Sequence, residues 1–321
     1  MEKTSCLILK GMLVLMVWLC LPSTIRADEV TVPDKNGNQL IYSYDSANGP
    51  ATFKGIKSYA TDASKAGHIV IADAVTDGNG NSHEVKYVGG SVSNRGNVVS
   101  IVFGKNIIAT GGEDGSKDDA FYNCDRLISV TLNAKLQILG RYTFQSCNNL
   151  ESINLGEATN LTTIKVKAFE DVDHVRQFTI PNSVTTIEES AFRSIDSVRT
   201  VTFATGSKLT TLGNDVFRDN TKMESINIEA CTQLTNFPNS WLYNCPSVKT
   251  LTVPASVETF GNSMFYYTDN IEAITFLAPT IPNDFYNGRS NLKTVNIGSG
   301  VKSIGNYAFR NSYGLTRLNI D

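Results

Sequence analysis

The chain has 321 residues, of which 41% are hydrophobic and 18% are charged, and its net charge is −3 at pH 7. This mild balance gives no electrostatic basis for nucleic acid or an anionic membrane as a partner. Three histidines leave few candidates for general acid–base catalysis.

Residues 1–27 are predicted to be a secretory signal peptide. A positively charged start precedes the apolar run 11–21, and cleavage is plausible after Ala27. The run is too short to span a bilayer. Cys20 ends the run, but the bulky residues before it fit poorly with lipoprotein processing. We therefore expect a secreted or cell-surface protein that has no membrane-spanning segment after signal cleavage.

Residues 28–97 are expected to form a β-rich N-terminal cap, because they do not carry the repeat that follows. Runs of alternating polar and apolar residues predict strands, and Asn-Gly and Asp-Gly pairs predict turns. A solenoid needs a cap to cover the exposed edge of its core. The predicted strands are 39–44, 51–58, 68–73 and 83–88.

Residues 98–321 repeat a unit of 21 to 25 residues. Each unit has an anchor, and we number slots from it. Slots +6, +9 and +11 are apolar in every unit, and so is slot −5 from the second unit on. Coordinated recurrence of this kind is the signature of a repeat architecture. The nine anchors are Phe121, Phe144, Phe169, Phe192, Phe217, Leu242, Phe265, Tyr286 and Phe309.

Each unit is predicted to contain one short strand. Slots +9 and +11 differ by two, so both side chains point to the core face, and slot +10 points away from it. Stacked units should form a parallel sheet, with the anchors as an internal aromatic column. The outward residues at slot +10 are Thr131, Asn154, Thr179, Thr202, Asn227, Thr252, Thr275, Asn296 and Asn319.

The units resemble BspA-like leucine-rich repeats. That pattern is a strand ending in Ile-Pro, then Ser-Val-x-x-Ile-Gly, then Ala-Phe; here 178–187 read FTIPNSVTTI and Ala191-Phe192 follow, while 299–309 read SGVKSIGNYAF. The resemblance implies a right-handed leucine-rich-repeat stack over 98–321, in a class often associated with adhesion. Several units are two residues longer than this pattern, which should affect curvature more than class.

Four cysteines follow residue 27. Cys124, Cys147 and Cys245 occupy slot +3, where other units carry Val or Ile, so we expect buried thiols that behave as small hydrophobes. A disulfide between Cys124 and Cys147 is sterically conceivable, but a pair of free thiols is favoured. Cys231 falls outside this slot, in a predicted turn, and is expected to be a free thiol.

The sequence shows no catalytic constellation. His68, His83 and His174 have no nucleophile or carboxylate at a telling spacing, and GxSxG, HExxH and P-loop motifs are missing. Segment 111–119 combines acids and glycines that could hold calcium, but it does not match an EF-hand loop, and a solvated loop is favoured. We expect neither an enzyme nor a cofactor nor a bound metal.

The outward Thr and Asn column is the candidate binding face, because repeat solenoids commonly bind partners across an extended sheet face. Its residue types predict an uncharged hydrogen-bonding platform, although they would serve β-propensity and solubility equally well. Exposed aromatics such as Tyr243, Tyr266 and Tyr267 could add contacts, or could pack between units.

Binding is therefore the expected function. The first hypothesis is an exported, adhesin-like protein that engages a host or neighbouring-cell protein. A glycan is the alternative ligand of the uncharged face. A third hypothesis is self-association through the uncapped apolar edge at Leu318 and Ile320, just before Asp321.

Overall fold

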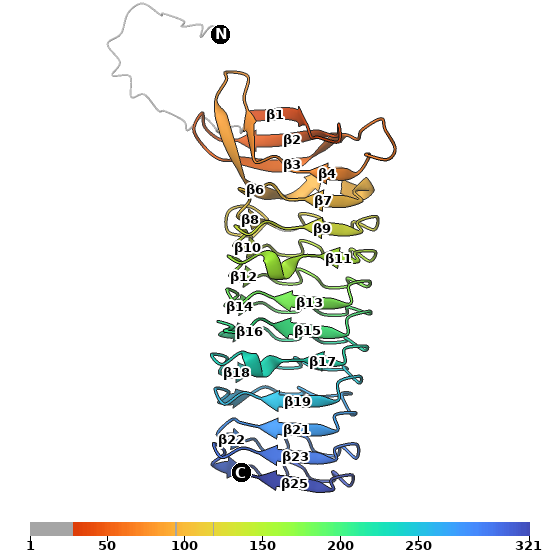
Figure 1. Ribbon diagram of the computed structural model, residues 1–321, viewed down its shortest axis with the longest axis vertical. Helices are drawn as coiled ribbons and strands as arrows, with labels where there is room; N and C mark the ends of the chain where they lie inside the picture. The colour runs from red at the N-terminus through yellow and green to blue at the C-terminus, as the bar shows by residue number, and fades with distance from the viewer. Residues whose placement is uncertain (1–27, 94, 118) are drawn as a thin grey trace, which may run out of the picture.

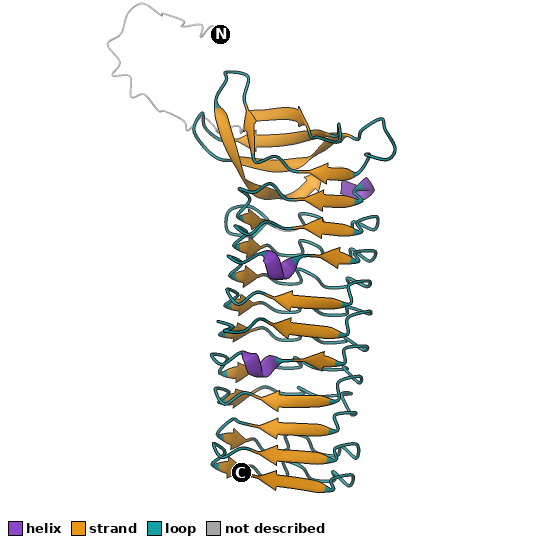
Figure 2. Ribbon diagram, in the orientation of Figure 1, coloured by secondary structure: helices purple, strands orange, loops and turns teal. Residues whose placement is uncertain are grey.

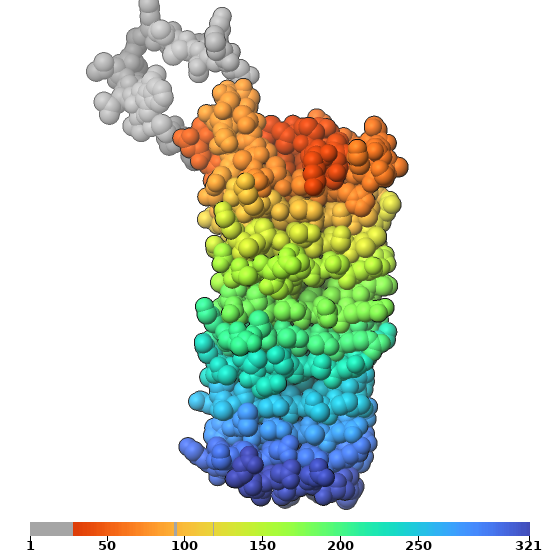
Figure 3. Space-filling model, in the orientation of Figure 1, coloured from red at the N-terminus to blue at the C-terminus, as the bar shows by residue number. Residues whose placement is uncertain are grey.

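The computed structural model describes residues 28–93, 95–117 and 119–321. These residues form one elongated column, with the earliest strands at one end and the last unit at the other (Figures 1 and 3). The predicted signal peptide, including Cys20, lies outside the described residues. Within them, no helix is long and apolar enough to cross a membrane.

Six strands form the first part of the column. β1 to β3 form an antiparallel sheet, and β3 then pairs in parallel with β6. β2 and β3 have the predicted bounds, whereas β1 and β5 were missed by the sequence pattern. The boundary at residue 97 between the N-terminal cap and the repeats stays a prediction. The strands are β1 (Asp28–Pro33), β2 (Gln39–Tyr44), β3 (Ala51–Ser58), β4 (His68–Val70), β5 (Ala74–Thr76) and β6 (Ser82–Ser93).

The predicted strand of each unit is present. The strands pair in parallel within three successive sheets, of which the first begins with β4 and β7. Slots +9 and +11 are buried or nearly so in all units except the last, where Leu318 and Ile320 are exposed. The series is β7 (Ser100–Val102), β9 (Ser129–Thr131), β11 (Ser152–Ile153), β13 (Gln177–Ile180), β15 (Thr200–Phe203), β17 (Ser225–Ile226), β19 (Thr250–Val253), β21 (Ala273–Phe276), β23 (Thr294–Ile297) and β25 (Arg317–Ile320).

A second series of two-residue strands runs along another side of the column (Figure 1). It continues the β3–β6 sheet, so the first strands and the solenoid share hydrogen bonding. Its members are β8 (Ala109–Thr110), β10 (Ile138–Leu139), β12 (Thr163–Ile164), β14 (Thr186–Ile187), β16 (Thr211–Leu212), β18 (Asn236–Phe237), β20 (Thr259–Phe260), β22 (Thr280–Ile281) and β24 (Ser303–Ile304).

Prolines interrupt this second series. Elsewhere the residue that follows the strand donates its N–H to the unit before, as Gly213 does to the carbonyl of Ile187 at 2.8 Å. Pro238 and Pro282 occupy the same slot and have no N–H to donate. The series accordingly breaks between β16 and β18 and between β20 and β22.

The anchor segments form the third side of the column. The residues at slots −2 and +2 adopt a left-handed backbone in every unit, for example Ser190 at φ 54° and Ser194 at φ 55°. These bends let the N–H groups at slots −2, 0 and +2 donate to the next unit. Phe192 N, for example, bonds to Val216 O at 3.0 Å.

The anchor rings stack along the column axis. Phe121, Phe144, Phe169, Phe192 and Phe217 have successive ring centroids 5.2–5.8 Å apart and interplanar angles of 7–23°. This confirms the predicted aromatic column as far as Phe217. Leu242 ends it, and the later rings meet edge-on, as Phe265 and Tyr286 do at 78°.

Extra residues in two of the longer units form 3-10 helices directly after the strand. These are η2 (Leu155–Glu157) and η3 (Ile228–Ala230), and both protrude on the strand side of the column (Figure 2). Each shortens its strand to two residues, so the first series divides into three sheets. The extra residues thus interrupt the strand series, whereas the sequence analysis expected them to affect curvature.

All four described cysteines are free and buried. Slot +3 does more than pack, because its polar members donate to the carbonyl of the preceding anchor. Cys147 Sγ lies 3.2 Å from Phe121 O, and Cys245 Sγ lies 3.1 Å from Phe217 O. Cys231 follows η3 in the position that Ala158 occupies after η2, and it is fully buried. Burial raises the pKa of Cys231 to about 11 and that of Cys245 to about 12.

Candidate binding face

The slot +10 residues lie on the outside of the strand series, as the period-two pattern requires. Registers pair Thr179 with Thr202, and align Thr252, Thr275, Asn296 and Asn319 in one row. Their side chains are exposed or half-buried. We call this surface the strand face.

Two members of the column stabilise the backbone instead of standing free. Asn154 Oδ1 accepts from Leu132 N at 2.7 Å, and its Nδ2 donates to Leu132 O at 3.1 Å. Asn227 bonds to Phe203 N and O in the same way, at 2.7 and 3.0 Å. Each replaces the strand bonds that are lost where η2 or η3 begins. The side chains of Asn154 and Asn227 are therefore committed to the backbone.

Charged residues at slot +7 border the strand face, so the uncharged Thr and Asn column is flanked by charges that the sequence analysis did not include. Arg199 pairs with Glu224, and Lys293 Nζ lies 2.7 Å from Glu272 Oε2. All are at least 42% exposed. The sign of the charge alternates at this slot from Arg199 to Lys293, a pattern that is visible in the repeats of the sequence. The slot holds Ile128, Glu151, Arg176, Arg199, Glu224, Lys249, Glu272, Lys293 and Thr316.

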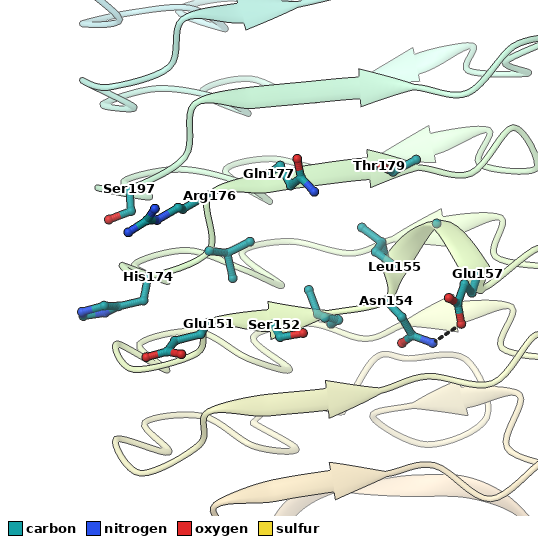
Figure 4. A pocket seen from close by; sticks show the side chains of 13 residues that line it. Glu151, Ser152, Asn154, Leu155, Glu157, His174, Arg176, Gln177, Thr179 and Ser197 are labelled. Carbon is teal, nitrogen blue, oxygen red and sulfur yellow. Dashed lines mark hydrogen bonds between the residues drawn. The ribbon is translucent and has the colours of Figure 1, made fainter.

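A hollow of about 830 Å³ lies on the strand face between β11, η2 and β13 (Figure 4). Glu151 and Arg176 line it at one end, and Asn154 with Glu157 line it beside η2. The Asn154 amide donates to Glu157 Oε2 at 2.8 Å, which fixes that wall. The hollow thus presents an acid, a base and an amide–carboxylate pair.

A second hollow lies three units further along the column, and its lining corresponds to the Glu151 and Arg176 end of the first. Glu224 and Lys249 line it, each 73 residues after its counterpart Glu151 or Arg176. Ser247 and Asn270 likewise follow His174 and Ser197 by 73 residues. The two hollows are three units apart, which at the usual strand spacing is about 14 Å.

The three histidines belong to separate environments. His83 is buried against Tyr44, and its Nε2 lies 3.4 Å from Asp77 Oδ2. His68 Nδ1 contacts Ser100 Oγ at 2.8 Å, and His174 lies at the first hollow. In the described part of the chain no three His, Cys, Asp or Glu side chains gather as metal ligands do, and this includes the described residues of segment 111–119.

Tyrosines gather on the anchor side, away from the strand face. Tyr243 stacks on Tyr266 at 5.5 Å, and Tyr267 meets Tyr266 edge-on at 4.4 Å. The Arg218 guanidinium lies 4.2 Å from the centre of the Tyr243 ring. Tyr266 and Tyr267 are 49% and 55% exposed, so these side chains pack between units and also face solvent.

The repeats match a known family over most of the chain. Six copies of the BspA type Leucine rich repeat region match residues 114–249, 162–289 and 210–321. The chain belongs to this BspA-type family. The resemblance that the sequence suggested is thereby confirmed, as is the leucine-rich-repeat solenoid.

Solved structures of other leucine-rich repeat proteins are similar to this chain at low identity. A leucine-rich repeat protein from Bacteroides ovatus has a TM-score of 0.50 and 21% identity, covering 86% of this chain and 80% of that one. A leucine rich cell surface protein from Faecalibacterium prausnitzii has a TM-score of 0.42 and 17% identity, covering 91% and 95%. No curated protein matches the chain.

Proposed function

We propose that this BspA-type protein is an exported, adhesin-like binding protein that engages an extracellular protein through the strand face. The observation that carries the proposal is a pair of hollows that are lined by equivalent charged residues at the border of that face. Each presents a carboxylate from one unit and a base from the next, Glu151 with Arg176 and Glu224 with Lys249. A partner that spans about 14 Å would meet the same chemistry twice.

The charges of both signs at slot +7 favour a protein over a glycan as the partner of this face. Charges of both signs are complementary to a protein surface that carries the opposite pattern, and they set orientation and association rate. A neutral glycan would use the threonines but would leave these charges unmatched. Exposed pairs such as Lys293–Glu272 contribute little to folding, since exposed ion pairs are typically worth at most about 1 kcal/mol.

A screen of the purified protein against immobilised extracellular-matrix, serum and cell-surface proteins tests the proposal. We expect at least one partner, with an affinity that falls as salt rises, because the bordering charges are exposed and therefore screened. Binding that does not depend on salt would argue against the charged border. A blank panel, combined with concentration-dependent association in sedimentation, would replace the proposal with self-association.

A further inference from the structure

One unit-to-unit junction of the solenoid is open on its anchor side. At the junctions on both sides of it, the anchor segments are joined by three backbone bonds. Ser240, Leu242 and Asn244 donate to the next unit at 3.0, 3.2 and 2.7 Å. Asp284, Tyr286 and Gly288 do the same at 2.9, 2.8 and 2.7 Å.

Between the Phe265 and Tyr286 units these bonds are missing. Of all the described residues, none accepts a backbone bond from the N–H of Ser263, Phe265 or Tyr267. An asparagine ladder at slot −3 stops at the same place. Asn262 N bonds to Asn239 Oδ1 at 2.7 Å, and Asn306 N to Asn283 Oδ1 at 2.6 Å. The intervening bond, from Asn283 N to Asn262, is not formed in this described segment. The junction thus leaves a row of backbone donors facing a row of acceptors.

The cause lies in the sequence of this unit. Phe265 and Tyr286 are 21 residues apart, because the turn between Phe276 and Ile281 is two residues shorter than its counterpart in the preceding unit. Pro282 then removes the N–H that would join β22 to β20. On the strand face β21 and β23 remain paired over four residues. The junction is therefore closed on the strand face and open on the anchor side.

A cavity of about 320 Å³ fills the open side. Segments 260–266 and 282–287 form its two walls, and Arg289 lines it as well. Arg289 is held at the cavity by an ion pair with Asp269 at 3.1 Å and by a bond to Phe265 O at 3.3 Å. Its Nε is buried without a partner. Because the charge of Arg289 is already paired, the cavity offers no free cation for an anionic ligand.

An aromatic platform borders this cavity. Tyr266 lines it, and the rings of Tyr243 and Tyr267 pack on Tyr266. Tyr243 is held in turn by Arg218, which bonds to Asp215 at 3.1 Å and to Asp219 at 3.2 Å. The exposed rings are therefore held in place by their neighbours. Little side-chain entropy would be lost when a ligand stacks on them.

We propose that this open junction is a binding site for a neutral saccharide. A sugar ring can lie on the exposed tyrosines, and its hydroxyl or N-acetyl groups can reach the unpaired N–H and C=O groups of the two walls. An inserted peptide strand fits less well. The Phe265 and Tyr286 rings are 5.7 Å apart, as in closed junctions, whereas an extra strand needs about 4.8 Å of further separation. The site is separate from the strand face and goes beyond the proposed function.

Hydrogen exchange by mass spectrometry tests the open junction and the ligand together. In the free protein, amides in 262–268 should exchange faster than those in 239–245, the matching segment of the closed junction before it. An array of neutral and N-acetylated oligosaccharides supplies the probe, and the sugar that binds best should slow exchange in 262–268. The Tyr266→Ala/Tyr267→Ala variant should lose at least about tenfold in affinity for that sugar.

A matched control separates this site from general effects of losing tyrosine. Tyr313→Ala removes a side chain that is 85% exposed in the last unit, and it should bind the sugar as the wild type does. Binding of a protein partner at the strand face should be unchanged in the Tyr266→Ala/Tyr267→Ala variant, so the two proposals can fail independently. Equal exchange in the two segments, a blank array, or sugar binding that survives the double substitution would each overturn the inference.

Discussion

Replacing Phe192 with alanine is expected to lower the free energy of unfolding by about 3–5 kcal/mol. The ring is fully buried between Phe169 and Phe217, whose centroids lie 5.2 and 5.7 Å away, and Phe178 meets it edge-on at 5.0 Å. The anchor segments on both sides are tied to this unit by backbone bonds, so they cannot move inward to fill the space. The cavity would therefore persist, which puts the cost near the upper end for such substitutions.

Urea denaturation followed by circular dichroism measures this loss. Thr202→Ala is the matched control, because Thr202 lies on β15 of the same unit and points outward. It should change stability by no more than about 0.5 kcal/mol. Equal losses at both positions would contradict the assignment of inner and outer faces.

Replacing Asn220 with leucine is expected to cost about 2–4 kcal/mol, although the two side chains are similar in size. Asn220 is fully buried at slot +3 of the Phe217 unit. Its Oδ1 accepts from Ile195 N at 2.7 Å, and its Nδ2 donates to Phe192 O at 2.9 Å. Leucine would leave both backbone groups buried without a partner, and each such group costs about 1–3 kcal/mol.

The same denaturation experiment distinguishes this effect from loss of any asparagine. Asn160→Leu, at an exposed turn, should be nearly neutral. If Asn220→Leu proved as stable as the wild type, slot +3 would be a packing position only. The donor role that we assign to Cys147 and Cys245 at that slot would then also be wrong.

The apolar slots made the fold predictable. A strand face, a core face and an aromatic column follow from side-chain periodicity and from the inability of one unit to bury its own apolar side. The role of the polar residues at slot +3 was not predictable, because Cys, Asn, Thr and Ser share that slot with Val and Ile. Only the backbone geometry shows that their donors meet the carbonyl of the preceding anchor.

The candidate site was predicted less completely than the fold. The outward Thr and Asn column was placed correctly, but the role of Asn154 and Asn227 depends on where the strand ends. The first hollow is lined in part by a 3-10 helix, η2, that residue periodicity does not reveal. The sequence does contain a signal for the two 3-10 helices, because the segments that follow Asn154 and Asn227 are equivalent and lie 73 residues apart. The bordering charges can likewise be found at slot +7 of the repeats. Whether this face binds a partner remains the central prediction.

The most direct test of that claim is a double charge reversal, Arg176→Glu with Lys249→Glu, which changes the base in both hollows. Lys208→Glu with Lys302→Glu makes the same change in net charge at exposed residues that precede β16 and β24, off the strand face. Affinity for the partner found by the screen should fall at least about tenfold in the first variant, which corresponds to about 1.4 kcal/mol, and should barely change in the second. Equal affinities in the two variants would contradict binding through the strand face.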